Sequence, residues 1–164
     1  MLAEKGHEVV VIDPAEYNLP MLGKMFLEMK EPEERFVKIH NLLEDADGYI
    51  MITAEYNHSV PPALKNLLDH FKPEYMYKPT GIISYSTGPF GGIRAAEHLR
   101  NICATLRTVA IPNSLPISKS HETINEDGTS VNGDYERRSK GFFEEFGWYV
   151  EALKNQRISK GIPK

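Results

Sequence analysis

Short runs of apolar, largely β-branched residues alternate along the chain with longer segments of helical periodicity. Unbroken apolar runs of this length are typical of strands buried on both faces of a parallel sheet. We predict such strands at residues 9–12, 49–53, 81–85 and 108–111. Apolar residues at three- and four-residue spacing predict helices over 31–46, 61–71, 93–106 and 142–153, with loops over 17–29 and 119–134. The alternation predicts an α/β fold, a mostly parallel sheet with helices on both faces.

Length and charge limit the class of protein. The 164 residues fit one domain, residues 1–164, and 41% hydrophobic with 26% charged residues is ordinary globular usage. With 19 Lys and Arg against 23 Asp and Glu, the formal net charge is -4, so we expect no nucleic-acid partner. No apolar run approaches the ~20 residues that span a bilayer, so we expect no membrane partner. Charged residues near the start do not fit a signal peptide, and we expect a reducing, cytoplasmic location.

Residue types that often carry chemistry are isolated in the sequence. Cys103 is the single cysteine, which excludes an intrachain disulfide framework, and its apolar neighbours Leu99 and Leu106 predict a buried small hydrophobe. The six histidines form no H-x3-H or H-E-x-x-H pair, so we predict no metal site. Asp13 ends a predicted strand without a preceding glycine fingerprint and is interpreted as a turn residue. The aromatic residues within 142–149 are typical of a core or a subunit contact.

The first residues do not fit the strand–helix alternation. Residues 2–6 have the pattern of the last turn of a helix that ends at Gly6. In an α/β chain this helix should follow a strand, and the sequence holds none before it. A strand of about 5–6 residues, a short loop and most of a helix of about 11–12 residues would add roughly 15–25 residues upstream. We therefore expect that the chain begins late.

Two loops follow predicted strands at the edge where open parallel sheets bind ligands. One runs from Ala54 to Pro62, and the other runs from Ser86 to Arg94 with glycines at positions 88, 91 and 92. Backbone N–H groups beside glycines can approach a ligand closely because no Cβ intervenes. The spacing is neither G-x-G-x-x-G nor that of a P-loop. A glycine-rich turn by itself more often serves only to close a tight turn.

Together the two loops are more specific. The first contains Glu55-Tyr56-Asn57 and then residues 63–66, Ala-Leu-Lys-Asn; the second contains residues 84–88 and 90–96. This combination resembles the NAD(P)H-dependent FMN reductase family of quinone, azo-dye and chromate reductases, from Leu2 to about Leu153. The resemblance implies a three-layer flavodoxin-like fold, FMN as cofactor, and NADPH or NADH as electron donor. It also implies a ping-pong cycle that ends on a quinone or similar small-molecule acceptor, and a homodimer with helices 63–71 and 93–106 partly at its interface.

In similar proteins, the loop matching residues 54–57 holds one edge of the isoalloxazine ring and the loop matching 86–92 lies against its pyrimidine end. Tyr56 and Phe90 would flank the site, and Ala54 stands where the family usually has proline. Backbone N–H donors can stabilise charge that develops on the ring, so we predict no catalytic side chain. The resemblance implies cofactor-binding roles for Glu55, Tyr56, Asn57, Ser86, Thr87, Gly88, Gly91 and Gly92.

The family's first strand and its phosphate-holding loop have no counterpart in the sequence. In the 2-1-3-4-5 strand order, that strand would lie between residues 9–12 and 49–53. Each missing charge-assisted hydrogen bond costs on the order of 1.5–3 kcal/mol. We expect the loss of two or three such bonds to weaken FMN binding at least about a hundredfold. The alternative is a truncated, flavin-free flavodoxin-like protein that acts as an interaction subunit or has no activity. The flavin absorbance of the purified chain distinguishes the two.

Overall fold

The protein is described by a computed structural model over residues 2–163. The chain divides into two compact units, and each is described by itself. The sheet unit comprises Asp47–Pro61 and Tyr77–Lys164, and the helical unit comprises Met1–Ala46 and Pro62–Met76.

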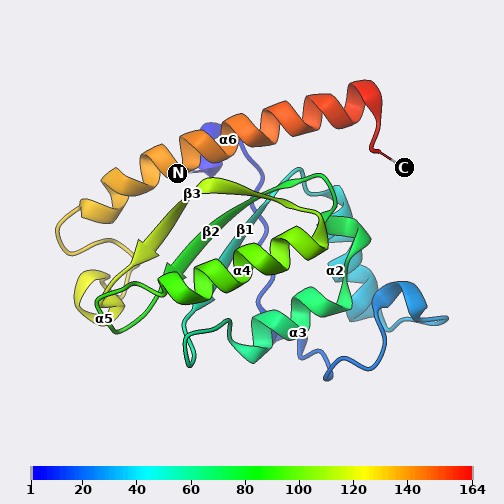
Figure 1. The fold of residues 1–164 in the computed structure, drawn as a ribbon, viewed down its shortest axis with the longest axis horizontal. Helices are drawn as coiled ribbons and strands as arrows, with labels where there is room; N and C mark the ends of the chain where they lie inside the picture. The colour runs from blue at the N-terminus through cyan, green and yellow to red at the C-terminus, as the bar shows by residue number, and fades with distance from the viewer. Residues whose placement is uncertain (1, 164) are drawn as a thin grey trace. The chain divides into compact units, whose positions relative to one another are not determined.

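A parallel sheet with a helix on each face forms the sheet unit (Figure 1). The strands lie in the order β1-β2-β3, all parallel. Helix α4 covers one face of the sheet and α6 covers the other (Figure 1). The predicted α/β class is confirmed, and the helix predicted over 93–106 has the observed bounds. The elements of this unit are β1 (Tyr49–Ala54), β2 (Pro79–Tyr85), α4 (Ile93–Leu106), β3 (Val109–Ile117), α5 (Ser120–Thr123) and α6 (Asp134–Lys160).

The face under α6 is built from aromatic and aliphatic side chains. Ile111, Leu115, Phe142 and Phe146 form one buried cluster, which confirms a core role for part of the aromatic run. Gly81 in β2 leaves room for the rings, because a Cβ there would lie 2.7 Å from Phe142 Cζ. The close approach of helix and strand therefore depends on a glycine.

The C-terminal half of α6 is held by polar contacts. Arg157 donates to the carbonyl of Tyr77 at 3.1 Å and to the carboxylate of Asp47 at 3.2 Å. Lys154 reaches the other oxygen of the same carboxylate at 2.6 Å. These contacts fix the helix well beyond the aromatic cluster, so α6 extends past the end predicted for it.

The face under α4 contains Cys103. Its side chain is fully buried, with Sγ 4.0 Å from Met51 Sδ, and Leu99 and Leu106 on the same helix are buried with it. The prediction of a buried small hydrophobe is confirmed. Burial raises the pKa of the Cys103 thiol to about 11, so the residue is a neutral thiol at neutral pH.

Strand β3 is longer than the predicted segment 108–111, and that predicted end is wrong. The strand continues through Pro112 and Pro116. Thr80 pairs with Ala110 but Ile82 pairs with Ser114, so a step of two residues in β2 matches a step of four in β3. This bulge contains Pro112, and an edge strand tolerates proline because the missing N–H is not needed for the ladder.

The helical unit confirms the helices predicted over 31–46 and 61–71, with later starts. Gly6, at φ 84°, closes the first turn by donating its N–H to Ala3, as predicted for a helix end. The carboxylate of Asp13 accepts the N–H of Ala15 at 2.9 Å, which confirms the interpretation as a turn residue. The elements are the 3₁₀ turns η1 (Ala3–Lys5), η2 (Phe26–Glu28) and η3 (Pro73–Tyr75), with helices α1 (Pro14–Tyr17), α2 (Glu34–Asp45) and α3 (Pro62–His70).

The strand predicted at residues 9–12 is wrong. Val9, Val10 and Val11 are 53%, 53% and 76% exposed and belong to no regular element. The described part of the helical unit contains no β-strand, so these backbone groups have no ladder partner in it. A β-branched run favours a strand only where a neighbouring strand and a packed face exist.

The side chain of Asn66 gives the loop predicted over 17–29 part of its shape. It donates to the carbonyl of Pro20 at 2.9 Å and accepts the N–H of Leu22 at 3.0 Å. The loop prediction is confirmed apart from the short turns at its two ends.

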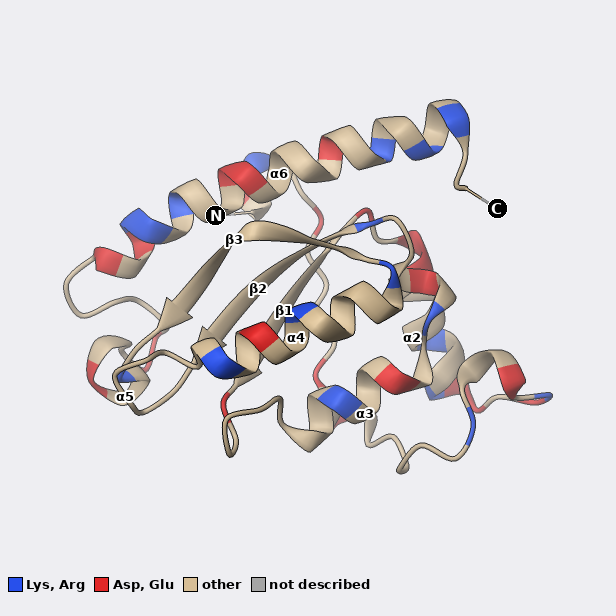
Figure 2. Ribbon diagram, in the orientation of Figure 1, with Lys and Arg blue, Asp and Glu red and all other residues tan. Residues whose placement is uncertain are grey.

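Acidic and basic residues are interspersed along α4 and α6 (Figure 2). Neither helix therefore presents a continuous basic stripe of the kind that follows a nucleic-acid backbone. Within residues 2–163, no helix combines the length and the apolar character needed to cross a membrane.

Alkaline pH should destabilise the protein through Cys103. The folded-state pKa, about 11, lies above the unfolded value of 9.0. Its contribution to stability is therefore complete below about pH 9 and is lost as the pH rises toward 11. We expect the free energy of unfolding to fall by about 2 kcal/mol over this range. Urea unfolding of the wild type and of Cys103→Ala at several pH values measures this free energy. If it falls equally steeply with pH in both proteins, the prediction is wrong.

Candidate functional site

The two candidate loops start at the same edge of the sheet. β1 and β2 pair in parallel, with Ala54 opposite Tyr85 at their carboxyl ends. The loop after β1 and the loop after β2 therefore leave the sheet side by side. This is the edge at which open parallel sheets bind ligands.

Glu55 connects the first loop to the start of α4. Its Oε2 accepts the backbone N–H of Arg94 at 3.1 Å and that of Ala95 at 3.4 Å. Its Oε1 lies 3.5 Å from the guanidinium of Arg94. The side chain is only 11% exposed. The carboxylate, predicted to bind a cofactor, is thus engaged within the protein.

A tight turn follows at Tyr56–Ser59. Tyr56 and Ser59 exchange backbone hydrogen bonds at 3.0 and 2.9 Å. Asn57 and His58 between them have φ values of 49° and 64°, the pattern of a type I′ turn. Asparagine adopts this conformation readily, and both side chains are exposed. Tyr56 is 61% exposed, so it is available to a flat ligand.

Gly91 and Gly92 let the second loop pack on the ends of the strands. Their φ values are 62° and 75°. A Cβ on Gly92 would lie 2.9 Å from the carbonyl oxygen of Tyr85, and one on Gly91 would lie 3.0 Å from the backbone nitrogen of Ile117. Ser84 Oγ donates to the carbonyl of Gly91 at 2.7 Å. These two glycines therefore serve backbone packing, whereas a Cβ on Gly88 would meet only Ser86 Oγ at 3.8 Å.

The second loop leaves backbone donors unused. Within residues 2–163, the N–H groups of Thr87, Gly88, Gly91 and Gly92 make no hydrogen bond. The N–H groups in the first turn of α4, in contrast, all donate hydrogen bonds, either to the Glu55 carboxylate or to loop carbonyls. Thr87 is exposed and Gly88 is half-buried, whereas Gly91 and Gly92 are buried. The loop, rather than the helix start, thus offers donors to a ligand carbonyl or ring nitrogen, through Thr87 and Gly88.

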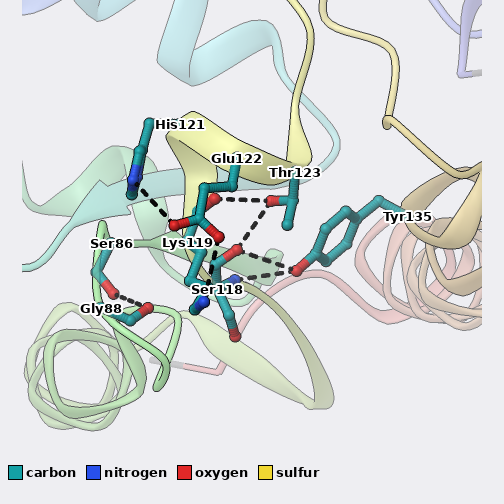
Figure 3. Close-up of polar contacts among 8 residues, drawn as sticks. All are labelled: Ser86, Gly88, Ser118, Lys119, His121, Glu122, Thr123 and Tyr135. Carbon is teal, nitrogen blue, oxygen red and sulfur yellow. Dashed lines mark hydrogen bonds and ion pairs between the residues drawn. The ribbon is translucent and has the colours of Figure 1, made fainter.

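The segment around α5 supports the second loop from the β3 side (Figure 3). Ser120 donates its N–H to the carbonyl of Ser86, and Lys119 donates its N–H to that of Gly88, each at 3.0 Å. The Ser86 hydroxyl points back to the Gly88 carbonyl at 3.3 Å, and its N–H donates to Ile117 at 3.2 Å. Ser86 is thus a residue that shapes the loop.

A network of side chains holds α5 in turn. Tyr135 accepts the N–H of Ser118 at 3.0 Å, and Thr123 Oγ1 donates to the carbonyls of Ser118 and Lys119 (Figure 3). The sequence showed this stretch only as a polar turn. Because the predicted strand ended at residue 111, the sequence did not place this stretch beside the second loop. A pocket of about 380 Å³ lies here, lined by Tyr85, Ile117, Ser120, His121 and Ile124.

Ser130 and Glu136 anchor the chain that leads from α5 into α6. Ser130 donates its N–H and its hydroxyl to the Glu136 carboxylate, and these bonds hold the pKa of that carboxyl below its usual range. Within residues 2–163, no group of three or more His, Cys, Asp and Glu side chains is arranged to hold a metal ion.

Known proteins resemble this chain over most of its length. The model of the family described as NADPH-dependent FMN reductase matches residues 1–122. A 2-hydroxy-1,4-benzoquinone reductase from Burkholderia sp is 27% identical over 157 residues, and the match covers 88% of this chain and 86% of that protein. An FMN-dependent NADPH-azoreductase from Staphylococcus aureus (strain USA300) is 31% identical over 137 residues, and the match covers 80% of this chain and 67% of that protein.

A solved structure agrees with these sequence matches. FerB from Paracoccus denitrificans, a flavoenzyme NAD(P)H:(acceptor) oxidoreductase, superposes with a TM-score of 0.63 at 25% identity. The match covers 84% of this chain and 76% of that one. The sheet edge described above is therefore part of a fold shared with a flavoenzyme.

Substitution of Gly92 should lower the stability of the protein, whereas substitution of Gly88 should have little effect. Gly92→Ala places a Cβ against the Tyr85 backbone at a φ that alanine disfavours, and we expect a loss of at least about 2 kcal/mol in stability. Gly88→Ala meets no backbone and has no positive φ, so it should change stability by less than about 1 kcal/mol. Urea unfolding compares the two, and equal losses would contradict the packing role of Gly92.

Proposed function

The chain belongs to the NADPH-dependent FMN reductase family, and on that basis we propose that it is a flavoenzyme that passes electrons from NADPH or NADH to a quinone. The family resemblance and the flavodoxin-like fold expected from the sequence are confirmed. FMN and a nicotinamide nucleotide are the cofactor and electron donor that membership carries. We take residues 1–164 as one flavodoxin-like domain.

The unused N–H donors of the second loop are the structural observation that supports the proposal. The isoalloxazine ring of FMN, when bound, supplies a two-electron acceptor whose pyrimidine end carries carbonyl oxygens. The N–H groups of Thr87 and Gly88 suit such oxygens, because they lack partners within residues 2–163 and neither residue is buried, whereas Gly91 and Gly92 are buried. Ser86 holds this loop in shape, and fixed donors need no reorganisation when charge develops nearby.

The first loop would hold the other edge of the ring. The backbone of Glu55 and Tyr56 and the amide of Asn57 lie at the carboxyl end of β1, beside the second loop. Tyr56 and Phe90 are 61% and 59% exposed, and these rings would exclude water from a flat ligand between them. No side chain here is needed as a proton donor, so the residues act by binding and orientation.

A quinone is the acceptor class that the relatives support best. The Burkholderia relative is named for a benzoquinone, and it covers the largest share of both chains among the relatives described above. The azoreductase relative indicates that other flat, conjugated acceptors suit related sites. A cytoplasmic location goes with this proposal, since the buried Cys103 thiol fits a reducing compartment.

The proposal is tested by titrating FMN into the purified chain and following NADPH oxidation with a benzoquinone as acceptor. We expect FMN-dependent turnover. Asn57→Gly keeps the positive φ but removes the amide, so FMN binding should weaken about three- to tenfold. His58→Gly in the same turn is the matched control and should leave FMN affinity unchanged. Absence of both FMN binding and turnover would favour the flavin-free alternative.

We also propose a homodimer. Tyr56, Phe90 and Ile93 expose apolar surface around the site, and a partner subunit that covers them would complete its walls. Sedimentation of the FMN-bound protein at tens of micromolar should give a dimer, and a monomer under these conditions would contradict this assembly.

A further inference from the structure

The first turn of α4 has no cap of its own. The residue at its N-cap position is Gly92, which has no side chain, and no acidic residue lies in the first turn. The N–H groups of Arg94 and Ala95 would otherwise lack partners, as the first N–H groups of any helix do. Such groups favour a negative charge, because the helix dipole is positive at this end.

Glu55 supplies the missing cap from another part of the chain. It lies 39 positions before Arg94, in the loop after β1, and its carboxylate accepts both N–H groups. Arg94 adds a contact of 3.5 Å to the same carboxylate, and its guanidinium lies 4.9 Å from the centre of the Phe90 ring. One carboxylate therefore connects the first loop to two backbone N–H groups and one side chain in the first turn of α4.

A second contact connects the same two segments. His98 Nδ1 and Ser59 Oγ lie 3.0 Å apart. His98 lies one helical turn after Arg94 on α4, and Ser59 lies four residues after Glu55 in the first loop. This hydrogen bond is exposed, whereas the Glu55 side chain is largely buried. Charge-assisted hydrogen bonds are the stronger kind, so Glu55 dominates this connection.

We infer that Glu55 is a positioning residue that fixes the first loop relative to the Ser86–Gly92 loop and so sets the spacing of the two edges of the flavin site. The carboxylate acts on the flavin through these loops rather than by touching it, and it prevents other anions from binding at the helix start. The effect on flavin rests on the proposed function. The connection between the loops does not.

Two substitutions at Glu55 separate its charge from its role as hydrogen-bond acceptor. Glu55→Ala removes the acceptor, so the FMN dissociation constant should rise at least about tenfold and the melting temperature should fall by about 5 °C. Glu55→Gln keeps one acceptor oxygen, so affinity should return to within about threefold of wild type. The visible circular dichroism of bound FMN should differ from wild type in the alanine variant and be restored in the glutamine variant.

Two controls lie on α4 itself. Glu97→Ala removes an exposed carboxylate one turn further on, whose one ion pair within residues 2–163 is with Arg100 at 3.5 Å. This variant should change neither affinity nor melting temperature. Arg94→Ala keeps the backbone N–H, so its melting temperature should fall less than that of Glu55→Ala.

Acetate provides a direct test, since it can replace the deleted carboxylate. In Glu55→Ala without FMN, tens of millimolar acetate should raise the melting temperature relative to chloride at equal ionic strength. Wild type and Glu97→Ala should show no such rise. A glutamine variant as impaired as the alanine variant, together with no acetate rescue, would overturn the inference. Failure of wild type to bind FMN would instead refute the proposed function, because the acetate test needs no flavin.

Discussion

The parallel hydrogen-bonded ladder between β1 and β2 is the constraint on which the rest of the sheet unit depends. It sets Ala54 opposite Tyr85, so the loops after the two strands leave the sheet together. The ladder is sheltered on both faces, by α4 through Cys103 and Leu99 and by α6 through Phe142 and Phe146. A parallel sheet requires such cover, since its strands are apolar on both sides. The site is thus a consequence of how the sheet is packed.

The glycines of the second loop show that one residue type can serve two purposes in the same loop. Gly91 and Gly92 have positive φ and lie against strand backbone, so they are required whether or not a ligand binds. A Cβ on Gly88 would meet only Ser86 Oγ, at 3.8 Å, so a ligand could approach the loop on that side. The glycine-rich pattern alone did not separate these roles, because close approach to a ligand and close approach to a strand both require the absence of a Cβ.

Two errors in the predicted strands have a common cause. The run at residues 9–12 has strong strand propensity, yet Val11 is 76% exposed and outside any sheet. The segment after Ile111 has prolines, yet it continues as β3. In each case the outcome depends on the neighbouring strand, which is absent in the described part of one unit and present in the other. Strand formation is decided by pairing, and a local pattern does not encode the partner.

The sequence by itself determined the α/β class, the position of α4, the burial of Cys103 and the two loops at the sheet edge. These follow from periodicity and from residue types whose physical demands are local. It also determined the family, because two motifs in fixed order carry it. Only the tertiary structure decided that Glu55 caps a helix that begins at Ile93, and that Ser86 is held by the segment around α5. Those contacts join residues more than thirty positions apart, and the sequence carries no local signal of which distant N–H group a buried carboxylate or carbonyl will meet.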